Sequence, residues 1–492
     1  MPVTAVSFCF TKKEEFILAN LGIHVHEQAT AVSIPVVASV GIPFVVGTAP
    51  VNAASSPAQS NVPVLVTSWQ EAVQKLGFSY DWKKYTLCEF MYSHFQLYGC
   101  QPVVFCNILN PDEMRADISA ADHTVQQHKI TLPFATINDE QLVVRNGGTK
   151  LMADEDYTVL YDENKDACIV ELLESGTAYD AVTLNVSRRE VSPEAVTVAD
   201  VVEGLGQIDA CMTRVGIIPD LICAPGWSHN TVVAAVMATK AAGINGLFGG
   251  KALIDCDTSE DGVREYSELT EYKNRNNFVD VNQIVCWPKL KLGDYQFHYS
   301  TQLAGLMAQV DTMNSGKPYE SPSNKKMQID GCCLEDGTEV NLTWEQVNLI
   351  AGSWGIVTAI NFMSMGWTAK GNYTACYPGN TDVKDQFIPV SRMFDFVGNT
   401  LIRTFWSKLD KPMNRRLIDT ILDTCNIWLN GLVSSEYLLG ARAEMLESEN
   451  PETDLMAGIM RIHVYITPPG PAQQIDFTLE YDLNYLKTAL AA

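Results

Sequence analysis

Residues 28–70 carry no charged side chain, and this long uncharged run strongly restricts what the chain can fold into. Prolines interrupt the run about every seven residues, at Pro35, Pro43, Pro50, Pro57 and Pro63. A lipid-exposed helix could not satisfy its backbone through so many prolines, because proline lacks an N–H and breaks helices. The valines and isoleucines between the prolines favour buried strands joined by turns. We therefore expect core strands here and no membrane insertion.

The charge balance restricts the partners. The chain has 492 residues, enough for about two to four domains. It carries 58 acidic residues against 34 basic ones, a net charge of −24. Phosphate contacts need clustered lysines and arginines, so we expect no direct contact with nucleic acid. A strongly acidic surface suits a protein that must stay soluble before it assembles.

The cysteines indicate a reducing compartment. There are 13 of them, an odd number, and none stands in a Cys-x-x-Cys motif. Cys332 and Cys333 are adjacent, which suits neither chelation nor an ordinary disulfide. The first ten residues contain no basic stretch, so they do not look like a signal peptide. We expect free thiols and synthesis in a cytoplasm.

The N-terminal part is predicted to be an extended arm and strand over residues 1–26, followed by the first part of a core over residues 27–112. Buried strands fit residues 34–48, 62–67 and 102–108. Ser68 and Glu71 form a capping box that opens a helix, because the serine oxygen can accept from the backbone N–H three residues on. A second helix fits residues 86–97.

Residues 113–193 are predicted to form a small inserted β domain. Several short apolar stretches are separated by turn-forming residues such as Asn146-Gly-Gly148. The expected strands cover residues 130–137, 142–145, 157–161, 168–172 and 181–187.

Residues 194–365 are predicted to form an α/β core domain with a mixed, largely parallel sheet. Expected helices at 198–213, 230–242, 262–272 and 301–311 alternate with expected strands at 220–224, 246–255 and 279–287. Residues 313–342 are rich in Asn, Ser, Gly and Pro, which indicates a loop.

Residues 366–492 are predicted to form a C-terminal α+β domain, completed by the N-terminal strands. Apolar residues recur at helical spacing from Val390 to Phe405, and again in a helix opened by Pro412 and closed by Gly431. Residues 459–466 and 475–482 are expected to pair as a terminal hairpin. In its second strand Ile475, Phe477, Leu479 and Tyr481 alternate with polar residues.

No residue pattern supports catalysis or the binding of a metal or cofactor. The glycine-rich residues 243–252 lack the first glycine and the Ser or Thr of a phosphate loop. His24 and His26 share a strand face without a third ligand. Ser228, next to His229, is a good N-cap, and no nucleophile elbow surrounds it. We predict no enzymatic activity.

Six segments in order resemble contractile tail sheath proteins of phages and related injection machines. They are Gly22-Ile-His-Val-His-Glu27, Val45-Val-Gly-Thr-Ala-Pro50, Pro63-Val-Leu-Val-Thr-Ser-Trp-Gln-Glu71, Pro219-Asp-Leu-Ile-Cys-Ala-Pro-Gly226, Leu303-Ala-Gly-Leu-Met-Ala-Gln-Val-Asp311 and Val390-Ser-Arg-Met393. The resemblance covers nearly the whole chain except the β insertion. Two departures are Ser321-Pro-Ser-Asn324, where the family has alanines, and Gly366-Trp367, which only weakly matches a family motif.

The resemblance implies a helical polymer of stacked rings, expected to be six-fold, around an inner tail tube. Contraction would drive the tube through a target envelope. Baseplate and tail terminator proteins would be further partners. The protein would be made in a bacterial cytoplasm and belong to a virion tail or contractile particle.

The resemblance also implies which surfaces carry the function. Chain ends would add strands to the sheets of neighbouring subunits. The residues expected in this strand exchange are Val3, Ala5, Phe8, Phe10, Ile23, Val25, Ile475, Phe477 and Leu479. A basic strip is expected to face an acidic tube through a polar contact that salt can screen. It consists of Arg403, Lys408, Lys411, Arg415 and Arg416.

Two other classes of protein remain as alternatives. A soluble α/β enzyme would show a polar pocket with perturbed titratable groups. A tube subunit would usually be shorter and mostly β. The basic strip itself could be no more than a solvated corner between two helices.

Overall fold

The computed structural model describes residues 35–490, and its centre is a six-stranded sheet in the order β14-β13-β12-β1-β3-β2. These strands are β1 (Pro43–Gly47), β2 (Val64–Val66), β3 (Val103–Asn107), β12 (Leu221–Cys223), β13 (Lys251–Asp255) and β14 (Gln283–Cys286). All neighbours in the sheet run parallel except β2, which is antiparallel to β3. The predicted α/β class and its largely parallel sheet are confirmed.

The uncharged run contributes the two strands β1 and β2 to this sheet. Every residue of β1 is buried, as expected for a central strand covered on both faces. Pro43 is the first residue of β1, and Pro63 immediately precedes β2. At these positions a proline, which has no N–H, does not remove a hydrogen bond from the middle of a strand. Within residues 35–490, no helix combines the length and apolarity needed to cross a bilayer.

Helices cover the sheet in the order expected of alternating α/β segments. They are α1 (Trp69–Leu76), α2 (Thr86–Met91), α3 (Val198–Gly206), α4 (Cys211–Val215), α5 (Thr231–Ala242), α6 (Leu269–Arg275) and α7 (Tyr299–Met313). The Ser68 hydroxyl accepts from the Glu71 N–H at 3.2 Å, as predicted, while the Glu71 carboxylate accepts from the Thr67 N–H at 2.8 Å.

The predicted cap of one helix was wrong. Asn230, and not Ser228, caps α5: its side chain accepts from the N–H of Val232 at 3.0 Å. Ser228 is instead fully buried and bonded to Asp255. The Ser228 hydroxyl donates to the buried carboxylate of Asp255 and does not cap the helix. Leaving that carboxylate unpaired would cost more free energy than losing a cap.

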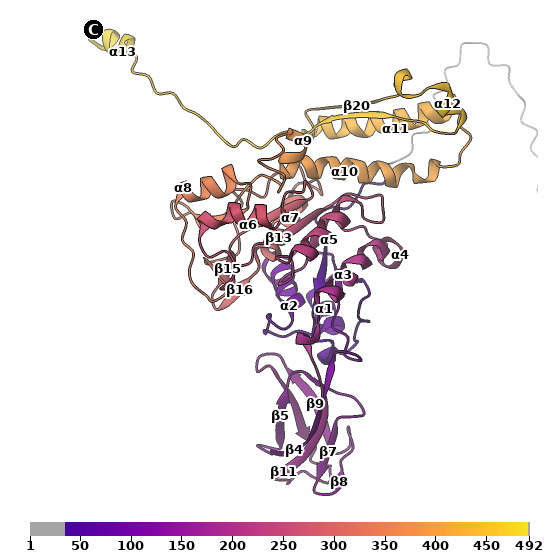
Figure 1. The fold of residues 1–492 in the computed structure, drawn as a ribbon, viewed down its shortest axis with the longest axis vertical. Coiled ribbons are helices and arrows are strands. Elements are labelled where there is room, and N and C mark those ends of the chain that lie inside the picture. The colour runs from indigo at the N-terminus through magenta and orange to yellow at the C-terminus, as the bar shows by residue number, and fades with distance from the viewer. Residues whose placement is uncertain (1–34, 491–492) are drawn as a thin grey trace, which may run out of the picture.

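The chain between β3 and α3 forms two small sheets around a core of their own. Their strands are β4 (Arg115–Thr124), β5 (Lys129–Pro133), β6 (Thr136–Ile137), β7 (Val143–Asn146), β8 (Thr149–Lys150), β9 (Tyr157–Asp162), β10 (Ala167–Leu172) and β11 (Thr183–Val191). Buried residues such as Val144, Cys168 and Val170 fill this core. Figure 1 shows the strands projecting from one end of the molecule. The strand β4 was not predicted because its residues are mostly exposed and show no apolar alternation. The boundaries 113–193 of an independent domain stay a prediction.

Two further small sheets flank the α/β core. One contains β15 (Lys289–Leu292), β16 (Tyr295–Phe297) and β17 (Gly331–Cys333), and the other is the hairpin of β18 (Thr358–Asn361) and β19 (Trp367–Lys370). The short helices α8 (Trp344–Val347) and α9 (Val383–Gln386) lie in this part. The segment expected to be a loop, residues 313–342, therefore includes a strand. Its three residues are too few to produce a periodic pattern.

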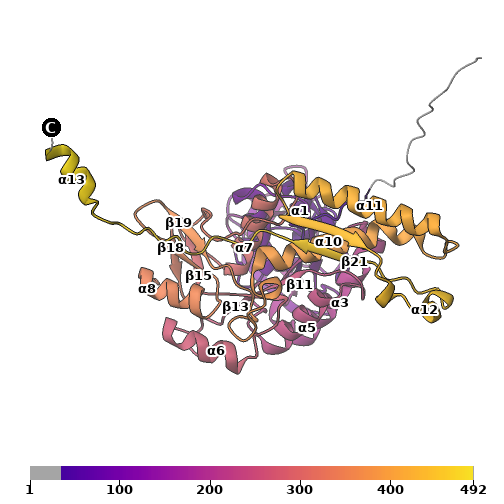
Figure 2. The ribbon, with the colours of Figure 1, turned by 90° about the horizontal axis from the view of Figure 1, so that it is seen from above.

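Two long helices form a layer on the core, α10 (Ile388–Phe405) and α11 (Arg415–Ser434). Their predicted apolar faces pack together through residues such as Met393, Phe396, Ile421 and Leu429. The predicted ends of α11 were wrong: it begins after Asn414, whose side chain accepts from the Leu417 N–H at 2.9 Å, and it continues through Gly431. Figures 1 and 2 show this layer above the central sheet.

The predicted terminal hairpin was wrong. β21 (His463–Thr467) pairs antiparallel with β20 (Gly440–Glu444), with α12 (Glu452–Met456) between them. Residues 468–482 form no strand within the described chain and lead to α13 (Leu483–Leu490). The Pro-Pro-Gly-Pro segment after β21 is the physical reason, because proline holds φ near −65° and favours an extended path over a reversal.

Candidate functional site

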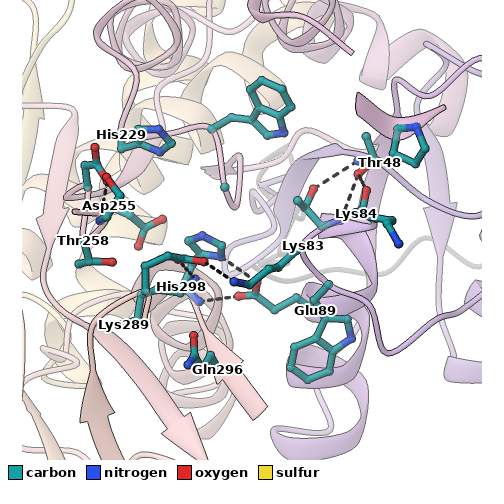
Figure 3. Close-up of a pocket in the computed structure, with 18 of the residues that line it drawn as sticks. Thr48, Lys83, Lys84, Glu89, His229, Asp255, Thr258, Lys289, Gln296 and His298 are labelled. Atoms are coloured by element: carbon teal, nitrogen blue, oxygen red, sulfur yellow. Dashed lines mark hydrogen bonds and ion pairs between the residues drawn. The ribbon is translucent and has the colours of Figure 1, made fainter. Parts of the chain in front are cut away.

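A pocket lies at the carboxyl ends of the central strands. Thr48 follows β1, Gly226 follows β12 and Asp255 ends β13, and all three line a cavity of about 480 Å³. On one side of β1 the sheet continues with β3 and β2, and on the other side it continues with β12, β13 and β14. Doubly wound proteins bind ligands at such a switch point. Figure 3 shows that side chains from both halves of the sheet converge here.

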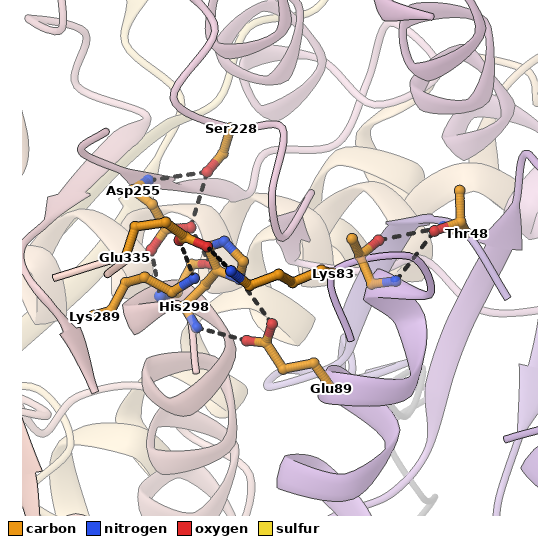
Figure 4. A network of polar contacts seen from close by, with 10 residues as sticks. Thr48, Lys83, Glu89, Ser228, Asp255, Lys289, His298 and Glu335 are labelled. Carbon is orange, nitrogen blue, oxygen red and sulfur yellow. Dashed lines mark hydrogen bonds and ion pairs between the residues drawn. The ribbon is translucent and has the colours of Figure 1, made fainter. Parts of the chain in front are cut away.

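Two buried carboxylates occupy the amino end of α7 beside this pocket. Glu89 accepts from the His298 N–H at 2.6 Å and lies 2.7 Å from His298 Nδ1. Asp255 accepts from the Ser300 N–H at 2.8 Å and from the Ser300 and Ser228 hydroxyls at 2.5 and 2.9 Å. Figure 4 shows both carboxylates in one network. Helix amino ends attract anions, and here the protein's own carboxylates fill that position.

The cations of the pocket are paired in the same way. Lys289 Nζ lies 2.5 Å from Glu335, and Lys83 Nζ lies 3.3 Å from the other oxygen of that carboxylate. Burial opposes ionisation of Glu335, but the attraction of Lys289 outweighs it and lowers the pKa of Glu335. The same balance, with His298 as the attracting group, lowers the pKa of Glu89. Both carboxylates are therefore ionised at neutral pH.

The histidines do not complete a catalytic or metal-binding group. Burial lowers the pKa of His229, so its imidazole is neutral at neutral pH. Within residues 35–490, no cluster of three or more His, Cys, Asp or Glu side chains could hold a metal ion. The hydroxyls of Ser228 and Ser300 bond to Asp255 rather than to a histidine. The pocket is polar and contains groups with shifted pKa values, as the enzyme alternative requires, and two of its carboxylates, Glu89 and Glu335, are paired with His298 and Lys289.

A buried cluster of ion pairs connects α10 to the end of the sheet opposite the pocket. We call this cluster the ionic joint. Arg392, which is 3% exposed, donates to Asp311 of α7 at 3.0 and 2.5 Å and to Asp220 at 3.0 Å. The other oxygen of Asp220 accepts from the Ile42 N–H at 2.7 Å, directly before β1. Lys251 of β13 forms an ion pair with Asp395 at 2.8 Å. Sequence reasoning missed this joint, although a charged residue inside the apolar run of α10 was a visible signal.

The first described residues of the chain run along α10. The Val36 and Ala38 N–H groups donate to the hydroxyls of Thr404 and Thr400 at 3.0 and 3.1 Å. Arg403, one of the predicted tube-facing residues, donates to the Val37 carbonyl at 3.1 Å. The root of the N-terminal arm is thus fixed to the same helix that the ionic joint holds.

The structure brings the remaining predicted basic residues together at the connection between α10 and α11. Lys411, Arg415 and Arg416 are exposed, and Lys408 is half-buried. The Arg415 side chain is 93% exposed and lies 3.7 Å from Asp419. Trp406 and Leu409, each 60% exposed, stand among these cations. The strip therefore has an apolar component that sequence reasoning missed.

The predicted strand-exchange residues divide into two groups. Val3, Ala5, Phe8, Phe10, Ile23 and Val25 lie outside the described residues. Ile475, Phe477 and Leu479 are 71, 86 and 96% exposed, on a segment that leaves the body of the protein. In the described chain β21 pairs only with β20, which leaves its other edge open.

Two known proteins are similar in sequence to most of this chain. No family model matches the chain. A curated tail sheath protein of Burkholderia phage BcepMu is 23% identical over 469 residues, covering 90% of this chain and 92% of that protein. A tail sheath protein of Escherichia phage P2 is 23% identical over 393 residues, covering 75% and 89%. The resemblance to tail sheath proteins is confirmed.

Solved sheath structures share the fold. The contracted sheath of the extracellular contractile injection system PVC aligns with a TM-score of 0.56 at 13% identity, over 95% of this chain and 99% of that one. The contracted helical sheath of the anti-feeding prophage gives 0.56 at 14%, over 95% and 100%. A sheath tail protein from Desulfitobacterium hafniense gives 0.51 at 12%, over 86% and 93%. At these identities the structures establish a sheath fold.

Proposed function

We propose that this chain is the repeating subunit of a contractile tail sheath, which polymerises helically around an inner tube and contracts to drive the tube through a target envelope. The observation that carries the proposal is its similarity to tail sheath proteins over 90% of its length, in sequence and in fold. Purified protein should form long hollow striated cylinders in negative-stain micrographs. A protein that stays monomeric under all assembly conditions would contradict the proposal.

Strand exchange between subunits is the proposed means of assembly. One edge of β21 pairs with no strand of residues 35–490, and the exposed segment 475–481 offers a strand with one apolar face. A contact of this kind joins different surfaces of two copies, so it propagates as a helical lattice. The N-terminal arm is proposed to add a second strand, because its root is fixed to α10 beside the same layer.

Deletion of residues 2–20 is expected to abolish cylinder formation while the subunit stays folded. The core described above is built from residues within 35–490, and chain ends tolerate deletion better than core elements, so we expect it to fold without residues 2–20. Circular dichroism should give an unchanged spectrum, and sedimentation should show only monomer at concentrations where the full chain pellets. Long cylinders from the truncated protein would refute a role for this arm in strand exchange.

The basic connection between α10 and α11 is the proposed contact with the inner tube. Residues 403–416 carry five basic residues and only Asp410 as an acidic one, in a chain with a net charge of −24. An acidic tube would attract this surface, and salt would weaken the contact. The exposed Trp406 and Leu409 would add a component that salt does not screen.

Neutralising Lys411, Arg415 and Arg416 together is expected to weaken co-assembly with the tube. Cylinders of the sheath protein alone should still form, because strand pairing does not involve these residues. Moderate salt should weaken co-assembly of the wild type in the same direction. Co-sedimentation with preformed tubes measures both effects, and normal co-assembly of the triple variant at every salt concentration would rule out this contact.

The remaining partners follow from the same proposal. One end of the sheath would meet a baseplate and the other a tail terminator, in stacked rings with six-fold symmetry. An anti-feeding prophage baseplate chain with the same fold, solved with six-fold symmetry, supports the first of these contacts. The particle would be a phage tail or a related injection device assembled in a bacterial cytoplasm. The proposal assigns no reaction to the polar pocket.

A further inference from the structure

An apolar patch without a partner in the described chain lies on α8, on the helical turn Asn348–Ser353 that follows it, and on the β18–β19 hairpin. We define the hairpin patch as Trp344, Leu349, Phe362, Met363 and Met365, whose side chains are 41–75% exposed. Trp344 and Phe362 contact each other at a ring separation of 5.3 Å. Exposed large apolar side chains that gather on one surface are typical of a binding site.

The tip of the hairpin has an unusual backbone conformation. Met363 and Ser364 have positive φ angles of 55° and 56°, a conformation that bulky residues rarely adopt. Two methionines at the tip give a surface that can adapt to a partner, because their side chains are flexible and polarizable. Surfaces of this composition often receive the apolar face of a helix.

The chain carries such a helix at its end. α13 places Leu483, Leu486 and Leu490 at helical positions i, i+3 and i+7, which share one face. These leucines are 59, 44 and 76% exposed. An eight-residue helix is marginal in water without a surface to pack on. We propose that α13 of one copy docks on the hairpin patch of a second copy.

The C-terminal segment carries α13 away from the body of its own copy. The Tyr373 hydroxyl donates to the Gln473 side chain at 2.8 Å, which ties the segment to the body. The nine residues from there to α13 span about 30 Å when extended. Figures 1 and 2 show α13 standing well away from the rest of the molecule.

Charge complementarity supports the same occupant. Lys370 Nζ lies 5.7 Å from the Trp344 ring, and the exposed Lys326 is bridged to Thr368 on the hairpin. Glu480 and Asp482 immediately precede α13, so a docked helix would bring opposite charges together.

The docking is compatible with the proposed strand exchange, on which it rests. In each copy the chain leaving β21 reaches Tyr373, three residues after β19. A segment 475–481 that ran beside a neighbour's β21 in the same direction would therefore bring the following helix toward β19 and the hairpin patch.

Cross-linking between two singly substituted copies tests the contact. Met363→Cys protein is mixed with Leu486→Cys protein, assembled and treated with a bis-maleimide. The native cysteines of residues 35–490 are all buried and react poorly. With Cys9 replaced by serine in every variant, a covalent dimer is expected in the mixture and in neither variant alone. Leu160→Cys, which is 51% exposed on β9, replaces Met363→Cys as the matched control and should give no dimer with Leu486→Cys.

The outcomes separate this inference from the proposed function. Cylinders without the dimer would overturn the docking and leave the sheath proposal standing. If no cylinders form, the sheath proposal fails, and absence of the dimer in a concentrated soluble mixture overturns the docking too. An internal cross-link in a dilute chain carrying both cysteines would show that α13 covers its own patch, which also contradicts the inference.

Substitution of the patch gives an independent measurement. Met365→Glu is expected to raise the concentration needed for assembly by about tenfold, because it adds an acidic charge where Asp482 and α13 dock. Val182→Glu, at a 73% exposed position of the β insertion, is the control and should change nothing. Equal assembly of the two variants would contradict the docking.

Discussion

Replacement of Arg392 by leucine is expected to lower the free energy of unfolding by about 3–5 kcal/mol, because it leaves buried carboxylates without their cation. Asp311 is 1% exposed and Asp220 is 7% exposed, so water cannot replace the lost guanidinium. Asp220 also holds the Ile42 N–H, and the variant should loosen the start of β1. Urea denaturation followed by tryptophan fluorescence measures the loss.

The pH dependence of this loss tests its electrostatic origin. Burial raises the pKa of Asp311, and Arg392 counteracts that shift. Without the arginine, the folded-state pKa of Asp311 should rise further above its unfolded value. The resulting destabilisation is present at neutral pH and diminishes as the pH falls and the carboxyl takes up a proton. The difference between wild type and variant should therefore narrow from pH 7 to pH 5.

Two further variants serve as controls for the joint. Arg415→Leu removes the same charge from a side chain that is 93% exposed, and should change stability by about 0.5 kcal/mol or less. Adding Asp311→Asn to Arg392→Leu should recover part of the loss, because one buried charge fewer remains. Equal losses from Arg392→Leu and Arg415→Leu would refute the ionic joint.

The second large effect is expected on assembly. Phe477→Lys should abolish cylinder formation, because a charge on the apolar face of the C-terminal segment would be buried against a neighbour at a cost of several kcal/mol. The subunit itself should stay soluble and equally stable, since Phe477 is 86% exposed in the described part of the chain. Analytical sedimentation and negative-stain micrographs measure assembly, and urea denaturation measures folding.

The matched control puts the same charge on the other face. Thr478 is the next residue and is also exposed, so Thr478→Lys should assemble nearly as well as wild type. Asp476→Asn, on the same polar face, should also be nearly silent. If Phe477→Lys and Thr478→Lys impair assembly equally, the assignment of the apolar face is wrong.

Local patterns in the sequence predicted most of the elements. The strand expected at residues 102–108 is β3, and the helix expected at residues 230–242 is α5. The apolar spacing from Val390 to Phe405 produces α10 as expected. These patterns succeed because a helix face or a strand face repeats within about ten residues. The exposed strand β4 escaped prediction because it has no such face.

The candidate site was less accessible to the same reasoning. The basic residues of 403–416 could be named because they are neighbours in the sequence. Asp311 and Asp220 precede Arg392 by 81 and 172 positions, so no local sequence pattern indicates that the three side chains meet. The pocket could not be predicted for the same reason. Its lining residues Thr48, Gly226 and Asp255 are far apart in the sequence and share only a place at or just after the end of a strand.

The sequence by itself thus determined the types and order of most elements and the resemblance to sheath proteins. Only the tertiary structure decided which strands pair: β21 pairs with β20, 19 positions earlier (463 − 444), and residues 475–482 form no strand with any part of the described chain. The physical reason is that a periodic pattern specifies which face of a strand is apolar, whereas its partner depends on which edge the whole chain brings within hydrogen-bonding distance.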